Sequence, residues 1–183
     1  MIVLTTRRLI LREMSSADLD DYAALLGDEY VMRYYPQPKT RDEAQDWINW
    51  NQRLYRDHGF GLWTVLLRST GEFVGDCGLT LQHVEDTEEI EVGYHVRASL
   101  QGNGYAPEAA RAARDFARDR LGLRRLIAII NPANLPSQRV AQKIGLTLEK
   151  RCTVYGLDCV IYAGVLHARA AGCESRPANR DMA

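Results

Sequence analysis

The sequence predicts one mixed α/β domain, because strand-like and helix-like segments alternate along most of its length. The chain has 183 residues, of which 46% are hydrophobic, enough for one domain with a full core. Residues 89–96 alternate as in a half-buried strand, whereas residues 106–121 are alanine-rich, as in a helix. The segments follow one another as a strand, helices, three antiparallel strands, a helix, a strand, a helix and two strands, with no internal repeat or linker.

The first third of the chain combines one strand with two helices. We expect the strand within residues 4–14, followed by a serine-capped helix over residues 15–27. Two prolines within residues 32–39 forbid continued helix. A second helix opens at Thr40, with Glu43 as its partner in a capping box.

Three strands then follow and are joined by hairpins. Residues 61–68 and 73–84 flank a turn around Gly71, and residues 89–96 form the third strand. This third strand has an apolar face with Ile90, Val92, Tyr94 and Val96, and an opposite face with Glu89, Glu91, Gly93 and His95.

The rest of the domain alternates between helix and strand. Residues 124–130 are nearly all apolar after two arginines, which indicates a central strand covered on both faces. Residues 131–145 form a loop and a short helix, and an antiparallel hairpin closes the domain. The pattern dissolves after Leu166, so we expect a domain over residues 1–166 and a disordered tail over residues 167–183.

Composition excludes several classes of protein. A net charge of −1 argues against general nucleic-acid binding. No stretch approaches the roughly 18 apolar residues that span a membrane, and the start of the chain lacks the apolar region of a signal peptide. The four cysteines show no CxxC spacing, so we expect free thiols and no metal. We therefore expect a cytoplasmic monomer or homodimer.

A glycine turn stands directly before the alanine-rich helix. Gly102 and Gly104 permit close backbone approach and positive φ, and Pro107 suits the first helical position. Such a helix start leaves N–H groups without partners and favours an anion beside them. The stretch is either an ordinary tight turn or a cradle for a phosphate. It is neither a dinucleotide fingerprint nor a Walker loop, because proline stands at position 107 and no Gly-Lys-Ser/Thr follows.

A second polar segment follows the next strand. Asn131 stands where residues 124–130 end, and Asn134 and Ser137 lie at the start of a short helix. Asparagine side chains offer donors and an acceptor to an extended, amide-bearing ligand. Asn134 is explained equally well as a helix cap.

These two motifs together resemble the GNAT acetyltransferase superfamily. Gln101, Gly104 and Ala106 match its Q/R-x-x-G-x-G/A pyrophosphate loop. Residues 131–146 are similar to its N-x-x-N-x-x-S…K-x-G-F segment, with Leu146 in place of phenylalanine. The resemblance covers roughly residues 4–166, and the branch that looks most similar contains ribosomal-protein N-terminal acetyltransferases, through "TTRRLILREM", "EVGYHV" and "DCVIYAGVL".

The resemblance implies acetyl-CoA as cosubstrate, a primary amine as acceptor and no metal. It implies a mostly antiparallel sheet in which strands 89–96 and 124–130 run parallel but splay apart, with the pantetheine arm in the gap. The implied acetyl-CoA contacts are Tyr94, His95 and Val96 for the arm, Gln101, Gly102, Asn103, Gly104, Tyr105, Ala106 and Pro107 for the pyrophosphate, and Asn131, Asn134 and Ser137 near the thioester.

Acetyl transfer to an amine needs groups that move protons. The amine must be neutral to attack, so a general base is useful. Glu91 is the candidate base, although a glutamate on a half-exposed strand more often lies on a solvated face. His95 has an intrinsic pKa suited to a proton relay, although a lone histidine is often structural. Ala141 stands where many relatives carry a tyrosine that protonates the departing thiolate, so that proton must come from water, Ser137, Tyr155 or Asp158.

The acceptor is less defined. The aromatic residues of the N-terminal helical part form either core or a wall of the acceptor site: Tyr34, Tyr35, Trp47, Trp50 and Tyr55. The acceptor is a protein N-terminus or a small-molecule amine, attacked in a ternary complex. The alternatives are a non-catalytic acyl-CoA sensor, motivated by Ala141, and a generic nucleotide-binding module.

Overall fold

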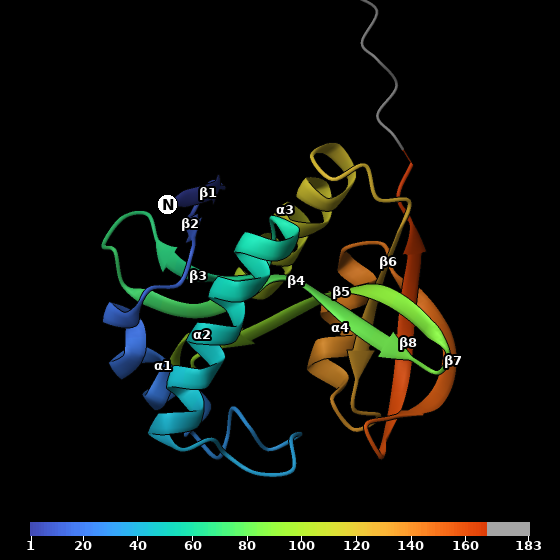
Figure 1. The fold of residues 1–183 in the computed structure, drawn as a ribbon, viewed down its shortest axis with the longest axis horizontal. Helices are drawn as coiled ribbons and strands as arrows, with labels where there is room; N and C mark the ends of the chain where they lie inside the picture. Colours follow the sequence, from blue (N-terminus) through green and yellow to red (C-terminus); the bar gives the residue numbers. More distant parts are fainter. Residues whose placement is uncertain (168–183) are drawn as a thin grey trace, which may run out of the picture.

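An eight-stranded mixed sheet organises the computed structural model, which describes residues 1–167 (Figure 1). Its strand order is β1-β2-β3-β4-β5-β6-β8-β7, and within the described residues β5 and β6 are the parallel pair. The strands are β1 (Ile2–Thr5), β2 (Leu9–Arg12), β3 (Leu62–Leu67), β4 (Phe73–Val84), β5 (Thr87–Val96), β6 (Arg125–Ile130), β7 (Thr147–Val154) and β8 (Leu157–Val165). The mostly antiparallel sheet confirms the expected fold class. Apart from His167, the expected tail lies outside the described residues.

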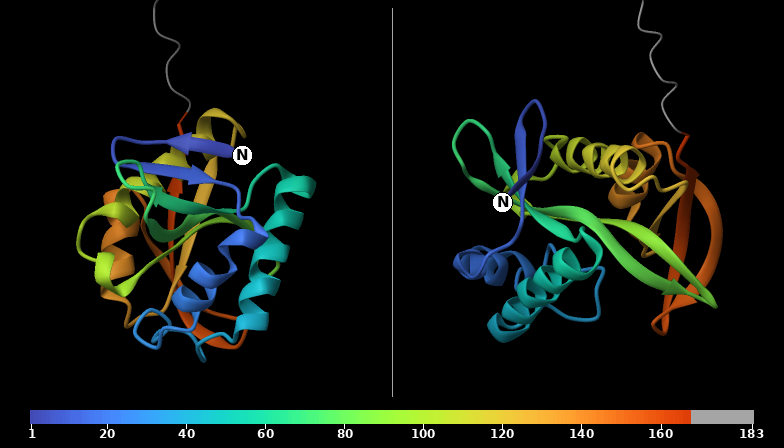
Figure 2. Two further views of the ribbon diagram at one scale, coloured as in Figure 1. Left: turned by 90° about the vertical axis from the view of Figure 1, so that its left-hand side faces the viewer. Right: turned by 45° about the horizontal axis from the view of Figure 1, so that its top comes forward.

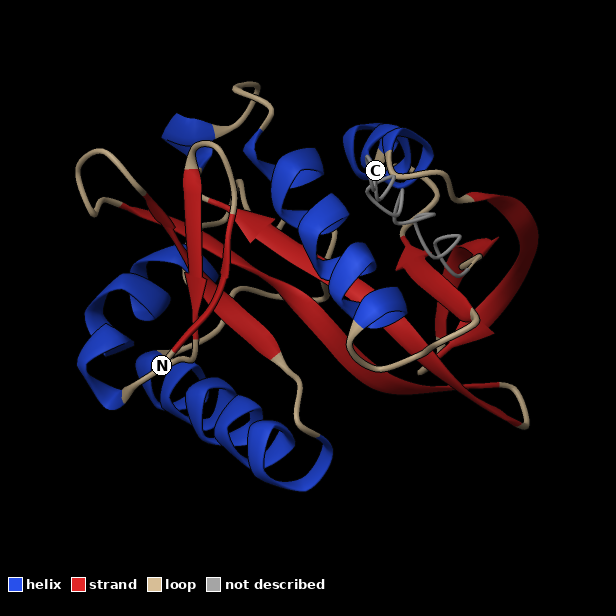
Figure 3. Ribbon diagram, turned by 90° about the horizontal axis from the view of Figure 1, so that it is seen from above, coloured by secondary structure: helices blue, strands red, loops and turns tan. Residues whose placement is uncertain are grey.

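Helices cover both faces of this sheet (Figures 2 and 3). They are η1 (Ser16–Asp18), α1 (Leu19–Leu26), α2 (Arg41–His58), η2 (Ala98–Leu100), α3 (Tyr105–Asp119) and α4 (Leu135–Lys143). α1 and α2 bury an apolar cluster that includes Leu25 and Ile48. α3 covers the opposite face, where Ala109 and Ala113 let the helix backbone approach the strands closely. The two apolar layers leave the polar face residues of β5 on the α1–α2 side.

The N-terminal segment differs from the expectation of one strand. Residues 4–14 contain a tight turn, so that β1 and β2 form an antiparallel hairpin. The Thr6 N–H donates to the Leu9 carbonyl at 2.9 Å, and the Thr6 hydroxyl accepts the Leu9 N–H at 2.9 Å. The single-strand prediction was wrong because a threonine side chain closes this turn without glycine or proline, the usual turn signals.

Two helix starts show how local chemistry sets the boundaries. The capping box of Thr40 and Glu43 is present at the start of α2, as expected. α3 begins at Tyr105, with Gly104 at its N-cap in a left-handed conformation. Pro107 is therefore the third helical residue and not the first, which corrects the prediction. Proline is tolerated there because first-turn N–H groups have no intrahelical acceptor.

Candidate active site

The parallel strands β5 and β6 separate directly after they pair. Glu91 opposite Ile127 is the register pair recorded between them in the described part of the chain. Further along β6, the Ile129 N–H donates to Glu91 Oε1 at 3.2 Å and not to the backbone of β5. The Glu91 side chain therefore lies at the point where the gap opens, and the expected splayed pair is confirmed.

The gap opens into a cavity of about 910 Å³. Its walls come from the centre of the sheet, the segment between α1 and α2, the loop before α3, α4 and the β7–β8 turn. The structure brings nearly all predicted site residues to this cavity: Glu91, Tyr94, His95, Val96, Gln101, Gly102, Gly104, Tyr105, Ala106, Pro107, Asn131, Asn134 and Ser137. Asn103 is not among the lining residues.

The loop before α3 presents main-chain donors. Gly102 and Gly104 have φ values of +82° and +79°, the left-handed region that favours glycine. Within residues 1–167, the N–H groups of residues 102–104 donate to no protein acceptor. Those of Tyr105 and Ala106 lie in the first turn of α3, where a helix supplies no acceptor. The loop thus has the free amides that an anion requires.

The side chains of the same loop serve its own backbone. Gln101 Nε2 donates to the Val96 carbonyl at 3.0 Å, and Asn103 Nδ2 donates to the Leu100 carbonyl at 3.1 Å. These bonds close the bend from within and leave its amides uncovered. Gln101 and Asn103 therefore shape the loop through their side chains.

Glu91 is a half-buried carboxylate on the cavity wall, held by hydrogen bonds from the protein. Its Oε2 accepts hydrogen bonds from Thr80 Oγ1 at 3.1 Å and from Gln82 Nε2 at 2.8 Å, in addition to the Ile129 N–H on Oε1. Burial raises the pKa of Glu91, and the three hydrogen bonds oppose this only in part. A carboxylate with a raised pKa in a cavity is suited to accept a proton.

His95 lies in a chain of hydrogen bonds that crosses the cavity wall. Its Nδ1 is 2.8 Å from Asp76 Oδ1, and its Nε2 is 2.8 Å from the Tyr35 hydroxyl. Asp76 has a fully buried side chain and also accepts the Trp47 indole N–H at 3.2 Å and the His95 main-chain N–H at 3.0 Å. The imidazole is thereby fixed between a carboxylate and a phenol.

The electrostatics of this chain favour the charged imidazole. Burial lowers the pKa of His95, but the charge and hydrogen bond of Asp76 raise it by more, so the net shift is upward. The Glu91 carboxylate adds to the upward shift, and Lys39 opposes it. Tyr35 is 47% exposed, but desolvation of its hydroxyl on the cavity wall raises its pKa, so the hydroxyl keeps its proton.

The side chains of Asn131, Asn134 and Ser137 are engaged in hydrogen bonds within the protein. Asn134 Oδ1 accepts the Ser137 N–H at 3.1 Å, which confirms its role as the cap of α4. Ser137 Oγ is 2.9 Å from the Tyr94 hydroxyl, which reaches it from the other face of β5. Asn131 Oδ1 accepts the Ala133 N–H at 2.9 Å, and its Nδ2 contacts the Tyr34 carbonyl at 3.4 Å. Asn131 thus links the end of β6 to the segment between α1 and α2.

The aromatic residues divide between core and cavity. Tyr34, Tyr35, Trp47 and Trp50 line the cavity, and the two tryptophan rings lie 5.2 Å apart. Tyr55 packs between the apolar clusters and donates its hydroxyl hydrogen to the Leu62 carbonyl. The wall interpretation therefore fits four of these residues, and the core interpretation fits Tyr55.

The remaining candidates for the leaving-group proton differ in their surroundings. Tyr155 lines the cavity from the β7–β8 turn, and Asp158 lines it from the start of β8. The Tyr155 hydroxyl donates to Gln82 Oε1 at 2.9 Å, and Gln82 in turn donates to Glu91, so Tyr155 is linked to Glu91 through one side chain. Ala141 is fully buried.

Several site residues escaped the sequence analysis. Asp76, Thr80 and Gln82 all lie on β4, facing β5 across the antiparallel ladder. The available signal was Asp76, a charged residue between glycine and cysteine in a strand of otherwise mostly uncharged residues. A charge in such a strand must be paired if it is buried, and His95 is its register partner.

Two other features of the described residues bear on the class of protein. Residues 1–167 contain no group of three or more His, Cys, Asp or Glu side chains arranged to hold a metal ion. No helix in this part of the chain is long and apolar enough to cross a membrane.

Comparison with known proteins gives a consistent result. A family model described as an acetyltransferase (GNAT) domain matches residues 8–147. "Uncharacterized protein YkkB" of Bacillus subtilis (strain 168) is 37% identical over 160 residues, which cover 87% of this chain and 93% of that protein. "Uncharacterized N-acetyltransferase YnaD" of the same organism is 32% identical over 157 residues, with coverage of 84% and 89%.

Solved structures share the fold. The acetyltransferase from Agrobacterium tumefaciens str. C58 aligns with a TM-score of 0.78 and 28% identity over 88% of this chain and 92% of that one. The ribosomal L7/L12 alpha-N-protein acetyltransferase RimL, in complex with coenzyme A, aligns with a TM-score of 0.74 and 19% identity, covering 91% and 98%. At that identity the second likeness shows the fold alone.

Proposed function

This chain belongs to the GNAT acetyltransferase family, and on that premise we propose that it moves an acetyl group from acetyl-CoA to a primary amine within a ternary complex. The observation that carries the proposal is the gap between β5 and β6. It opens into one cavity that is lined by free main-chain amides and, at the point of the gap, by the half-buried Glu91 carboxylate. The first feature suits a diphosphate and the second suits an amine that must lose a proton.

The residues present fit acetyl-CoA as the donor substrate. The amides of residues 102–106 would hold its pyrophosphate, and the free edge of β5 around Tyr94 would pair with the amides of its pantetheine arm. Asn131, Asn134 and Ser137 border the same cavity from the end of β6 and the start of α4. Their hydrogen-bonding groups are partly engaged, so their contribution is to shape the wall near the thioester.

Glu91 is proposed as the general base. An ionised carboxylate can accept about four hydrogen bonds, and Glu91 accepts three from Ile129, Thr80 and Gln82. The remaining position is available to the amine or to a water molecule that bonds the amine. When the new N–C bond forms, the amine proton passes to Glu91 directly or through that water.

The thiolate that leaves when the C–S bond breaks also needs a proton. We assign this step to the Tyr35 hydroxyl, with His95 Nε2–H replacing the lost proton and Asp76 holding the imidazolium. The supporting feature is that the Tyr35 hydroxyl is hydrogen-bonded to an imidazole whose pKa is raised by Asp76. Ser137 and Tyr155, in contrast, are bonded to the uncharged partners Tyr94 and Gln82.

The acceptor is a primary amine, either a protein N-terminus or a small molecule. Its wall is aromatic, from Tyr34, Trp47 and Trp50, and the half-buried carboxylate of Glu91 lines the same cavity. An aromatic wall next to an acid attracts an ammonium group and the carbon atoms attached to it.

The place of action that we propose is the cytoplasm. The thiols of Cys77, Cys152 and Cys159, among the described residues, are unpaired, which suits a reducing compartment.

The experiment is a thiol-release assay with acetyl-CoA and a panel of peptide N-termini and small amines. We expect release with at least one acceptor class, and a loss of kcat of about 100-fold or more in Glu91→Gln, with unchanged coenzyme A affinity. Glu88→Gln is the matched control, since Glu88 is an exposed carboxylate on the same strand.

Three outcomes would overturn parts of the proposal. Full activity of Glu91→Gln would remove Glu91 as the base. Tight binding of acetyl-CoA without thiol release across the panel would favour the sensor. Equal binding of ADP and acetyl-CoA would favour a nucleotide-binding module.

A further inference from the structure

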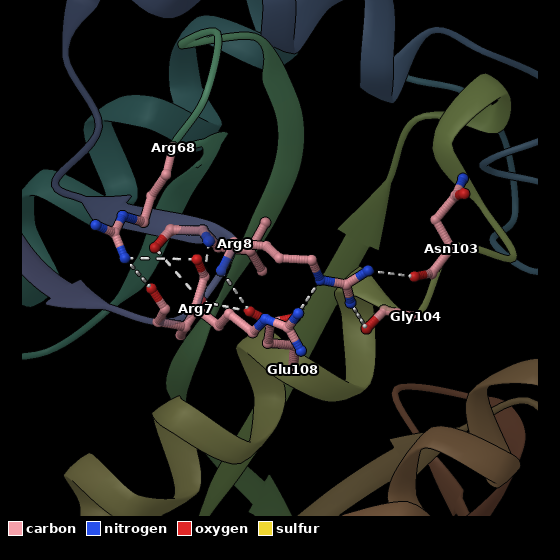
Figure 4. Close-up of polar contacts among 8 residues, drawn as sticks. Arg7, Arg8, Arg68, Asn103, Gly104 and Glu108 are labelled. Carbon is pink, nitrogen blue, oxygen red and sulfur yellow. Dashed lines mark hydrogen bonds and ion pairs between the residues drawn. The ribbon is translucent and has the colours of Figure 1, made fainter.

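Arg8 connects the N-terminal hairpin to the glycine loop, from which it is about 95 residues distant in sequence. Its Nη1 donates to the Asn103 carbonyl at 2.9 Å, and its Nη2 donates to the Gly104 carbonyl at 3.2 Å (Figure 4). Both acceptors belong to the peptide units that lead into α3. One guanidinium therefore grips two successive carbonyls of the loop.

The guanidinium is itself held in a fixed orientation. Its Nε donates to Glu108 Oε2 at 2.6 Å, while Glu108 Oε1 accepts the Arg8 main-chain N–H at 2.9 Å and the Thr6 hydroxyl at 2.6 Å. The guanidinium also stacks over the Tyr105 ring, 4.7 Å from its centroid. Glu108 is in the first turn of α3, so loop, helix and hairpin are joined at one cation.

The hairpin turn that carries Arg8 is fastened to the sheet as well. Arg68 Nη1 donates to the Thr6 carbonyl at 3.0 Å, and the Arg68 N–H donates to the Arg8 carbonyl at 2.9 Å (Figure 4). The Arg7 side chain, in contrast, makes no hydrogen bond or ion pair with any residue of 1–167. The two adjacent arginines thus differ in contacts while carrying the same charge.

Because peptide units are planar, hydrogen bonds to these two carbonyls also fix the directions of the neighbouring N–H groups. The carbonyl of one residue and the N–H of the next belong to one rigid plane and point in opposite directions. When Arg8 fixes the Asn103 carbonyl, it fixes the Gly104 N–H on the opposite side. When it fixes the Gly104 carbonyl, it fixes the Tyr105 N–H. Glycine at 102 and 104, with positive φ, would otherwise leave these planes free to rotate.

We propose that Arg8 is a positioning residue for donor-substrate binding, which orients the Gly104 and Tyr105 amides toward the diphosphate of acetyl-CoA. The inference rests on the proposed function. It adds a role for the N-terminal hairpin, which supplies no group to the cavity but determines the geometry of its anion site. Arg8 also keeps two carbonyl oxygens away from the phosphates, which they would repel.

The test compares Arg8→Ala with Arg7→Ala, measuring coenzyme A affinity by calorimetry together with KM and kcat. We expect Arg8→Ala to weaken binding on the order of 10- to 100-fold and to raise the KM for acetyl-CoA, with kcat at saturation nearly unchanged. Arg7→Ala, which removes the same charge from the same turn, should stay within about twofold of wild type, since Arg7 is exposed and its charge is screened by water and salt.

Arg8→Lys and Thr6→Val separate orientation from charge and from stability. Lysine keeps the charge but cannot bridge two carbonyls and Glu108, so it should restore little of the affinity. Thr6→Val removes one bond to Glu108 together with the bond from the Leu9 N–H that closes the hairpin turn. It should weaken binding by a few-fold, and its unfolding temperature, measured alongside, separates that loss from a loss of stability, which keeps the proposal testable if Arg8→Ala fails to fold.

Equal affinities of Arg8→Ala and Arg7→Ala, or full rescue by Arg8→Lys, would overturn the inference. Absence of coenzyme A binding in the wild-type protein would instead overturn the proposed function, so the two failures are distinguishable.

Discussion

The two ends of the cavity differ in how their chemistry is built. The glycine loop, residues 101–107, offers main-chain amides, and its side chains serve to shape it. The other part of the wall is a polar cluster of Asp76, Glu91 and His95, in which the Asp76 and His95 side chains are buried and the Glu91 carboxylate is half-buried. The function proposed for the loop depends on its backbone conformation, whereas that of the polar cluster depends on the charges of its side chains. Substitutions should therefore damage binding at the first end and proton transfer at the second.

The largest expected effect is that of Asp76→Asn. It removes the charge that raises the pKa of His95 and leaves burial, which lowers it. If protonated His95 supplies the proton, the rate falls on the alkaline side as pH rises through the pKa of His95, whereas the acid limb belongs to Glu91, whose carboxylate must be ionised to accept the amine proton. In Asp76→Asn, kcat should fall about 100-fold or more near neutral pH, and this alkaline limb should move to lower pH. The measurement is kcat against pH with both substrates saturating.

Asp18→Asn is the control for a merely structural effect. Asp18 is also buried beside α1, where it pairs with Arg12 at 2.5 Å. Its loss should lower stability without moving the pH profile. A profile of Asp76→Asn that coincides with wild type would show that the Asp76–His95 pair holds the fold together and takes no part in proton transfer.

The second prediction tests how far the polar cluster extends into the cavity. Tyr34 and Tyr35 both line the cavity, but only the Tyr35 hydroxyl is bonded to His95 in the described structure. Tyr35→Phe should lower kcat about 10- to 100-fold and leave the KM for acetyl-CoA nearly unchanged. Tyr34→Phe should keep the wild-type kcat and pH profile. Equal kcat values in the two variants would show that Tyr35 does not supply the leaving-group proton, which must then come from water or from another residue.

The difference between the two ends also explains what the sequence could predict. The glycine loop is contiguous, so the spacing of Gly102 and Gly104 narrows it to a tight turn or a phosphate cradle. The family resemblance, through Gln101, Gly104 and Ala106, then implies the cradle and the splayed strands. The boundary of α3 was misplaced because the left-handed Gly104 takes the N-cap position that a sequence pattern cannot locate.

The polar cluster, in contrast, is assembled from distant segments. His95 is hydrogen-bonded to Asp76 and Tyr35, which are 19 and 60 positions away in the sequence. No local sequence pattern predicts contacts between such distant residues. The same holds for Arg8, because its contact with the glycine loop depends on the position of the hairpin turn that Thr6 closes. Sequence indicated Glu91 and His95 as isolated candidates, and their burial and partners came from strand register.

The smallest expected effect separates strain from binding in the glycine loop. Gly104 and Gly59 both adopt positive φ, +79° and +75°, and Gly59 ends α2 with open space around its Cα. Alanine at either position should cost about 1–2 kcal/mol of folding stability, because a Cβ is strained in the left-handed region. Gly104→Ala should in addition weaken coenzyme A binding by roughly tenfold, as relief of that strain turns the Gly104 and Tyr105 amides. Equal coenzyme A affinities in Gly104→Ala and Gly59→Ala, at equal loss of stability, would show that the loop tolerates rotation of its peptide planes and that the anion site does not depend on their direction.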